Sequence, residues 1–319
     1  MKKMLSLIVL TAMILTMVVG ASASAETVKI GLSEPSLGWP YIAAYAEAFK
    51  GLLENNADVE AVVLSADGDI EKQTNDINDL IVQEVDVIMV CSLDGEAVIP
   101  ALAQADAAGI PVLAVSNEPG EAGKQYLTAY CGPDDYVEGG IAAKLMLEGL
   151  GYTEDTQDEL NFIIIEGTAG QSTTQLRRDA FEAYMAEHAP NAKILDSQPC
   201  DWDSTLEKSA MQAFITKYGD KISGVFAEGN SAATAEVCHE NGCTFPVVGV
   251  GFNQPEKDAI EGNYLYGAVC QAALADASLG LEKALEIADG TLVKGDYERF
   301  IIDMPTVTAA NVAETELDF

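Results

Sequence analysis

Basic residues are scarce in this chain. It has 17 lysines and arginines against 51 aspartates and glutamates, a formal net charge of −34 at pH 7. A surface with this excess of negative charge is a poor partner for nucleic acid and for anionic membrane surfaces. The hydrophobic fraction is nevertheless 49%, which predicts a globular protein with a large core and an acidic surface.

Histidine and the usual catalytic motifs are also scarce. The chain has only two histidines, His188 and His239, and both lie in helical stretches with no evident nucleophile beside them. Neither G-x-S-x-G nor H-E-x-x-H occurs, and no G-K-[ST] follows the glycines of 167–170. The motifs of serine hydrolases, zinc proteases and P-loop NTPases are therefore missing. We expect no enzymatic activity and no cofactor.

Only one apolar run is long, and it lies at the N-terminus. Lys2 and Lys3 precede the apolar residues 4–19, and small residues occupy 21–25. This is the layout of a secretory signal peptide, 1–25, which predicts cleavage after Ala25 and export to the periplasm or the extracellular face of the cytoplasmic membrane. An uncleaved anchor is the weaker alternative because the A-x-A site is clean. No later run is long enough to span a bilayer.

Cysteine is the remaining uncommon residue with possible structural meaning. An even number in an exported chain permits disulfides, whereas the apolar runs around several of them favour buried free thiols, so the pairing stays open. His239 lies beside Cys238, but a closed zinc site needs four good ligands, so we expect no metal. The six cysteines are Cys91, Cys131, Cys200, Cys238, Cys243 and Cys270.

A strand–loop–helix unit begins halfway along the chain. Phe162–Ile165 is a short apolar run typical of a buried strand, and residues 166–171 form a glycine-containing loop. Ser172 stands where an N-cap would, before a helix whose inner face has Leu176, Ala180, Phe181 and Tyr184. Residues 28–53 show the same pattern, so the fold starts twice. In open α/β sheets ligands sit at the carboxyl ends of the strands, so two such sheets can hold one ligand between their loops.

Further strands alternate with helices along both halves. This alternation predicts an α/β fold of two doubly wound parallel-sheet lobes with right-handed crossovers. The first series has strands at 28–32, 59–64, 85–91, 110–115 and 127–131, and the second has strands at 162–165, 193–195, 224–227, 246–250 and 266–270, before a long helix at 273–288 and a strand-like run at 300–304.

Several runs together resemble the ribose-binding type of periplasmic sugar-binding protein, with the type I fold. They occur in the family's order and span nearly the whole chain after residue 25. The runs are GWPY (38–41), GIPV (109–112), GTAG (167–170), SQPCDWD (197–203), GVFAEGN (224–230), VVGVGFNQP (247–255) and AVCQ (268–271).

The resemblance implies two lobes joined by a three-strand hinge that closes over one small ligand. It places the crossings near 131–134, 270–272 and 303–305, with an N-terminal lobe of 26–132 plus 271–303 and a C-terminal lobe of 133–270 plus 304–319. It also implies a monomer that delivers its ligand to an ABC transporter permease in the membrane.

The resemblance further assigns ligand-binding residues. Trp39, Tyr41 and Trp202 stand where the family places cleft aromatics. Several charged groups of the family are replaced by uncharged ones in this chain. Ser116 and Asn117 stand at the family's Asp-Arg pair, and Asn253 stands at the aspartate of its GFD motif. Gln175 stands at the family's binding arginine, and Arg177 follows two residues later. Gln271 is kept, and the asparagine before the next helix is displaced to Asn230.

Amides and a hydroxyl both donate and accept hydrogen bonds, so this set predicts a small neutral polar ligand, a sugar or sugar-like ring. A nucleoside or another heterocycle is an alternative for the same fold. A ligand-presenting accessory of a membrane sensor is the alternative to transport. Without the resemblance, Asn117, Gln175 and Asn253 read as ordinary loop or capping residues.

Overall fold

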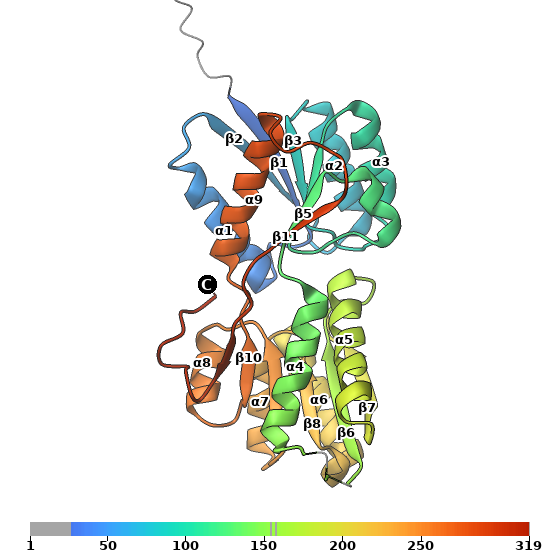
Figure 1. Cartoon of the computed structure of the whole chain (residues 1–319), viewed down its shortest axis with the longest axis vertical. Coiled ribbons are helices and arrows are strands. Elements are labelled where there is room, and N and C mark those ends of the chain that lie inside the picture. Colours follow the sequence, from blue (N-terminus) through green and yellow to red (C-terminus); the bar gives the residue numbers. More distant parts are fainter. Residues whose placement is uncertain (1–26, 154, 157, 319) are drawn as a thin grey trace, which may run out of the picture.

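The computed structural model describes residues 27–153, 155–156 and 158–318. The predicted signal peptide, 1–25, lies outside the described residues. Within them, two six-stranded sheets alternate with helices, as Figure 1 shows. This confirms the predicted α/β class with two parallel-dominated sheets.

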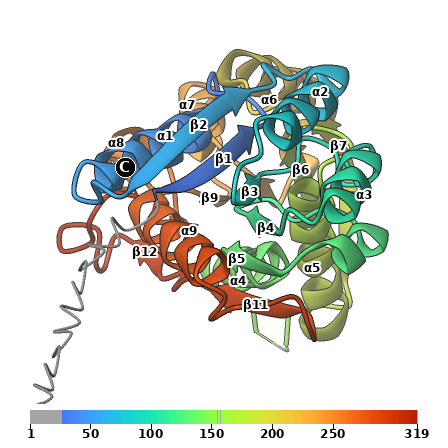
Figure 2. The same cartoon turned by 90° about the horizontal axis from the view of Figure 1, so that it is seen from above.

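The first sheet has the order β11-β5-β4-β3-β1-β2, and all of its neighbours are parallel. Its central strands are apolar and completely buried because helices cover both faces, α1 and α9 on one and α2 and α3 on the other (Figure 2). The elements are β1 (Val28–Glu34), α1 (Pro40–Leu53), β2 (Val59–Ser65), α2 (Ile70–Val82), β3 (Val87–Val90), α3 (Ile99–Ala108), β4 (Val112–Val115), β5 (Ala129–Gly132), α9 (Ala273–Ala288) and β11 (Glu298–Ile301), with a 3₁₀ turn at Glu121–Tyr126.

The second sheet has the order β12-β10-β9-β8-β6-β7, with only β12 antiparallel to its neighbour. Helices α4 and α5 pack on one face and α6, α7 and α8 on the other. The elements are α4 (Asp135–Leu150), β6 (Leu160–Glu166), α5 (Ser172–His188), β7 (Ala192–Pro199), α6 (Ser204–Tyr218), β8 (Gly224–Ala227), α7 (Ser231–Glu240), β9 (Val247–Val250), α8 (Gln254–Glu261), β10 (Gly267–Val269) and β12 (Thr306–Thr308), with a 3₁₀ turn at Gly219–Lys221.

The chain passes between the two sheets three times. It crosses after β5, after β10 and between β11 and β12, at 133–134, 270–272 and 302–305. These positions agree with those that the resemblance implies, near 131–134, 270–272 and 303–305. As a result, the long helix α9 covers the first sheet although it follows β10 of the second.

Local signals set the ends of several helices. Asp69, Asp134 and Asp203 each accept backbone N–H bonds at the start of α2, α4 and α6. One cap was predicted wrongly: Gln171 occupies the N-cap position of α5, and Ser172 is the first helical residue. The Ser172 side chain points instead to the first sheet's loops, where its Oγ lies 2.7 Å from Asn117 Oδ1.

Candidate functional site

A cavity of about 110 Å³ lies between the two sheets. Its lining residues follow the carboxyl ends of strands of both sheets: Pro35 follows β1, Ser116 follows β4, Trp202 follows β7, and Asn253 follows β9. Parallel strands end at one edge of their sheet, so the two facing edges bring together loops that are distant in sequence.

Eight of the nine predicted ligand-binding residues line this cavity: Trp39, Tyr41, Ser116, Asn117, Trp202, Asn230, Asn253 and Gln271. Gln175 does not. Its side chain is exposed on the outer face of α5, and its Nε2 donates to Asp179 Oδ1 at 2.7 Å. The residues of that helix that line the cavity are Thr173 and Arg177, two positions before and after Gln175.

The aromatic wall of the second lobe is Trp202. Its ring lies against two glycine backbones, since a Cβ on Gly167 would be 2.0 Å from Trp202 Cζ2 and a Cβ on Gly229 would be 2.9 Å from Cε3. The indole Nε1 donates to Gln171 Oε1 at 2.6 Å. Trp202 has φ +56°, a strained conformation for a bulky residue and one that clusters at ligand sites. The half-buried ring is therefore held in place at the cavity edge and is not part of the core.

We expect Trp202→Ala to weaken ligand affinity by about 1–3 kcal/mol, the range for stacking and burial of one ring, with little loss of fold stability. Trp39→Ala is the matched comparison, because Trp39 also packs against the first lobe's core and its loss should lower stability as well. Titration calorimetry and urea unfolding measure the two quantities. A Trp202→Ala protein that is unfolded, or that binds as the wild type does, contradicts the assignment.

In the first lobe, a buried carboxylate orients two cavity hydroxyls. Asp276 of α9 is fully buried, and its Oδ2 accepts from Tyr41 Oη at 2.8 Å and from Ser116 Oγ at 2.6 Å. Burial raises the pKa of Asp276 to about 7, although both hydroxyls lower it. Because Ser116 gives its hydroxyl proton to Asp276, the Ser116 oxygen can accept a hydrogen bond from a ligand.

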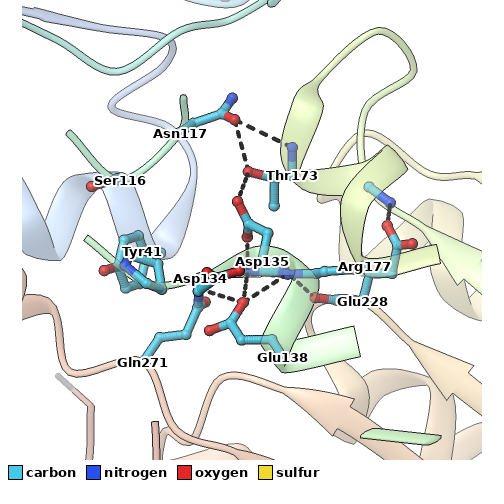
Figure 3. A network of polar contacts seen from close by, with 12 residues as sticks. Tyr41, Ser116, Asn117, Asp134, Asp135, Glu138, Thr173, Arg177, Glu228 and Gln271 are labelled. Atoms are coloured by element: carbon cyan, nitrogen blue, oxygen red, sulfur yellow. Dashed lines mark hydrogen bonds and ion pairs between the residues drawn. The ribbon is translucent and has the colours of Figure 1, made fainter. Parts of the chain in front are cut away.

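In the second lobe, Arg177 is the centre of a buried charge cluster (Figure 3). Its Nε lies 3.0 Å and its Nη2 2.9 Å from Glu138 Oε2, and Nη2 lies 3.2 Å from Asp135 Oδ1. Nη1 donates to the Glu228 backbone oxygen at 2.7 Å. Burial raises the pKa of the carboxyl groups of Asp135, Glu138 and Glu228, and the positive charge of Arg177 opposes that shift.

This cluster corrects one expectation from the sequence. Amides do not replace all of the charged groups, since Arg177, Asp135 and Glu228 also line the cavity. Helical periodicity was the signal for Arg177: it lies four residues from Thr173 and from Phe181, on the buried face of α5. Gln175 lies four residues before Asp179, on the exposed face. No local pattern singles out Asp135, Glu228 or Asp276.

Two side-chain amides of the cavity, those of Asn230 and Gln271, donate N–H groups to other parts of the protein. Asn230 Nδ2 donates to the Trp202 backbone oxygen and to Glu207 Oε1, both at 2.9 Å. Gln271 Nε2 donates to Glu138 Oε2 at 3.3 Å. Asn230 therefore offers a ligand its carbonyl oxygen, which is an acceptor, whereas Gln271 can offer its carbonyl oxygen and its second N–H.

Contacts between the lobes close one side of the cavity. Asn117 Oδ1, from the first lobe, lies 2.8 Å from Thr173 Oγ1 and 3.3 Å from Thr173 N at the start of α5. Gly95 N donates to Gly170 O at 3.4 Å. Asn117 is thus a bridge between the lobes as well as a lining residue.

Two findings bear on metals and membranes. The described residues contain no group of three or more His, Cys, Asp or Glu side chains arranged to hold a metal ion. In the same part of the chain, no helix has the length and hydrophobicity needed to cross a membrane.

Known proteins similar to this chain include solute-binding proteins. The xylitol-binding protein of Mycolicibacterium smegmatis is 27% identical over 91% of this chain and 80% of its own length. The ribose import binding protein of Bacillus subtilis is 26% identical over 86% of each chain. An ABC transporter solute-binding protein from Mycobacterium smegmatis, solved with bound glycerol, superimposes with a TM-score of 0.79 at 27% identity, over 90% of this chain and 96% of that one.

The family model described as periplasmic binding protein domain matches residues 30–292. That range contains both sheets' central strands and all of the cavity's lining residues. The chain therefore belongs to the periplasmic binding protein family.

Proposed function

We propose that this protein is an exported solute-binding protein that captures one sugar or polyol between its lobes and delivers it to an ABC importer, without chemical turnover. The relatives named for ribose import and xylitol binding support this class of ligand. The volume of the cavity, about 110 Å³, also supports this class of ligand. One water-sized group needs about 10–15 Å³, so the cavity has room for about seven to eleven such groups.

The observation that carries the proposal is the acceptor-rich lining. The hydroxyl oxygen of Ser116 and the carbonyl oxygens of Asn230 and Gln271 can accept hydrogen bonds from the ligand. Glu228 Oε1 is buried and has no donor among the described residues. A polyhydroxy ligand brings one O–H donor with each oxygen, so it satisfies this lining, while Trp39 and Trp202 cover its C–H faces.

A thermal-shift screen with ribose, xylitol, myo-inositol and glycerol tests the proposal, because a ligand at 100 times its Kd stabilises the fold by about 2.7 kcal/mol. The deoxy analogue of any sugar that binds should bind more weakly, since it leaves a buried acceptor unsatisfied. Mass spectrometry after long incubation should return the ligand unchanged. No shift with any polyol, or a converted product, contradicts the proposal.

The crossings support a division into a lobe of 26–132 plus 271–303 and a lobe of 133–270 plus 304–319, which we propose to move as two bodies about the three connecting segments. The protein would act as a monomer, in the periplasm or on the outer face of the cytoplasmic membrane. Its acidic surface would meet a permease at the membrane.

We expect a saturating ligand to close the lobes and to lower the radius of gyration in small-angle scattering. Asn117→Ala removes the bridge to Thr173, so the ligand-free variant should be more open than the wild type. An unchanged profile at saturation contradicts the hinge.

A further inference from the structure

Helix α7 ends in a motif that brings two cysteine side chains together. Gly242 follows the helix with φ +70°, and its N–H donates to the His239 oxygen at 3.0 Å. Cys243 N–H donates to the Cys238 oxygen at 2.9 Å. These two bonds define a Schellman motif, in which the residue after the glycine commonly contacts the residue five positions earlier. In this chain both residues are cysteines, and Cys243 packs against the core cluster that contains Cys238.

The other four cysteines are buried, two in a core cluster of the first lobe and two in a core cluster of the second. Cys91 follows β3 and Cys131 lies in β5, with β4 between those strands. Two strand spacings are about 9–10 Å, which exceeds the Cα separation of about 7 Å that a disulfide can span. Cys200 follows β7 and Cys270 follows β10, at nearly opposite ends of the second sheet.

We propose that Cys238 and Cys243 form a disulfide site, closed when the protein meets a disulfide oxidant such as glutathione disulfide outside the cytoplasm. The disulfide proposal rests on the proposed export in one respect only, which is the compartment where the oxidation takes place. The pairing itself rests on the end of α7, since the backbone motif brings Cys243 back to Cys238 before any bond forms.

The disulfide forms by two steps of thiol–disulfide exchange. The thiolate of Cys243, which is partly exposed, attacks glutathione disulfide and releases one glutathione thiolate. The thiolate of Cys238 then attacks the Cys243 sulfur and releases the second. The two protons lost by the cysteines pass to the two glutathiones. Burial raises the pKa of both cysteines, so uncatalysed exchange is slow and must be followed to equilibrium.

The bond would fasten the far end of a helix that begins at the ligand cavity. Helix α7 starts directly after Asn230, which lines the cavity. A helix of 10 residues is about 15 Å long, so the disulfide would fix the helix without touching a ligand.

Mass spectrometry can test the pairing on the intact protein. Trypsin cleavage after Lys221 and Lys257 releases the peptide 222–257, which contains Cys238 and Cys243 and no other cysteine. After equilibration with glutathione disulfide, denaturation and N-ethylmaleimide labelling, we expect this peptide to carry no label and to lack two hydrogens. After reduction it should take two labels. The other four cysteines should label without reduction.

Two labels on the unreduced peptide, or a bond from it to another peptide, would overturn the pairing. The variant Cys243→Ser is the control, because its remaining Cys238 should appear labelled or bound to glutathione and never internally bonded. All of these readouts are independent of ligand binding, so the pairing and the proposed function fail separately.

Discussion

Replacing Arg177 by methionine should destabilise the protein by about 3–5 kcal/mol, because it leaves buried carboxylates without their counter-charge. Arg177 is 4% exposed and contacts Asp135, Glu138 and the backbone of Glu228. Methionine fills a similar space but supplies neither charge nor donors. Ligand binding should also be lost, since Arg177 lines the cavity and lies 5.7 Å from the centre of the Trp202 ring.

Arg178→Met is the matched control on the same helix. Arg178 is partly exposed and pairs with Glu166 and Glu182, so its loss should cost no more than about 1 kcal/mol and leave binding intact. Urea unfolding of the two variants measures the difference. Equal stabilities would mean that the carboxyl groups around Arg177 are protonated in the native state and that the cluster is not an ion-pair network.

Glu34 should make the protein less stable as pH rises. Its side chain is completely buried at the end of β1, and neither carboxyl oxygen has a donor among the described residues. Burial, with a smaller contribution from the charge of Asp276, raises the pKa of Glu34 to about 8. The folded state therefore keeps a proton that the unfolded chain releases above pH 4.5, and stability falls between about pH 5 and pH 8.

Other buried acids act in the same direction, since burial raises the pKa of Asp276 to about 7, of Glu207 to about 8 and of Asp318 to about 6. Each contributes on the order of 1 kcal/mol per pH unit while only its folded form is protonated. We therefore expect maximum stability near pH 5, with a loss of several kcal/mol by pH 8.

The Glu34→Gln variant isolates one of these groups. Glutamine has the shape of the protonated acid and cannot ionise, so the variant should match the wild type at pH 5 and be more stable by roughly 3 kcal/mol at pH 9. Glu47→Gln, at an exposed position of α1, is the matched control for the change of residue type. Urea midpoints across this range check both. A Glu34→Gln protein with the wild-type pH profile would show that Glu34 ionises freely in the fold.

The sequence by itself determined the elements and their order. Short apolar runs such as Phe162–Ile165, bounded by glycine loops and amphipathic helices, predict buried parallel strands because only a strand of that length hides its backbone and both faces. The positions of the crossings came from the family resemblance and not from a local pattern. The resemblance placed Trp39 and Trp202 at the cavity, and both lie in loops at strand ends, where ligands of open α/β sheets bind.

Only the tertiary structure decided which polar groups act together. Ser116 and Asp276 are 160 residues apart, and Asn117 and Thr173 are 56 apart, yet each pair is hydrogen-bonded. Local sequence propensity does not predict which distant residues form a hydrogen bond, because this depends on how the helices pack on the sheets and how the sheets face each other. Burial then settles the chemistry: a carboxyl group reads as a surface charge in the sequence, whereas at Glu34 loss of water makes it retain a proton.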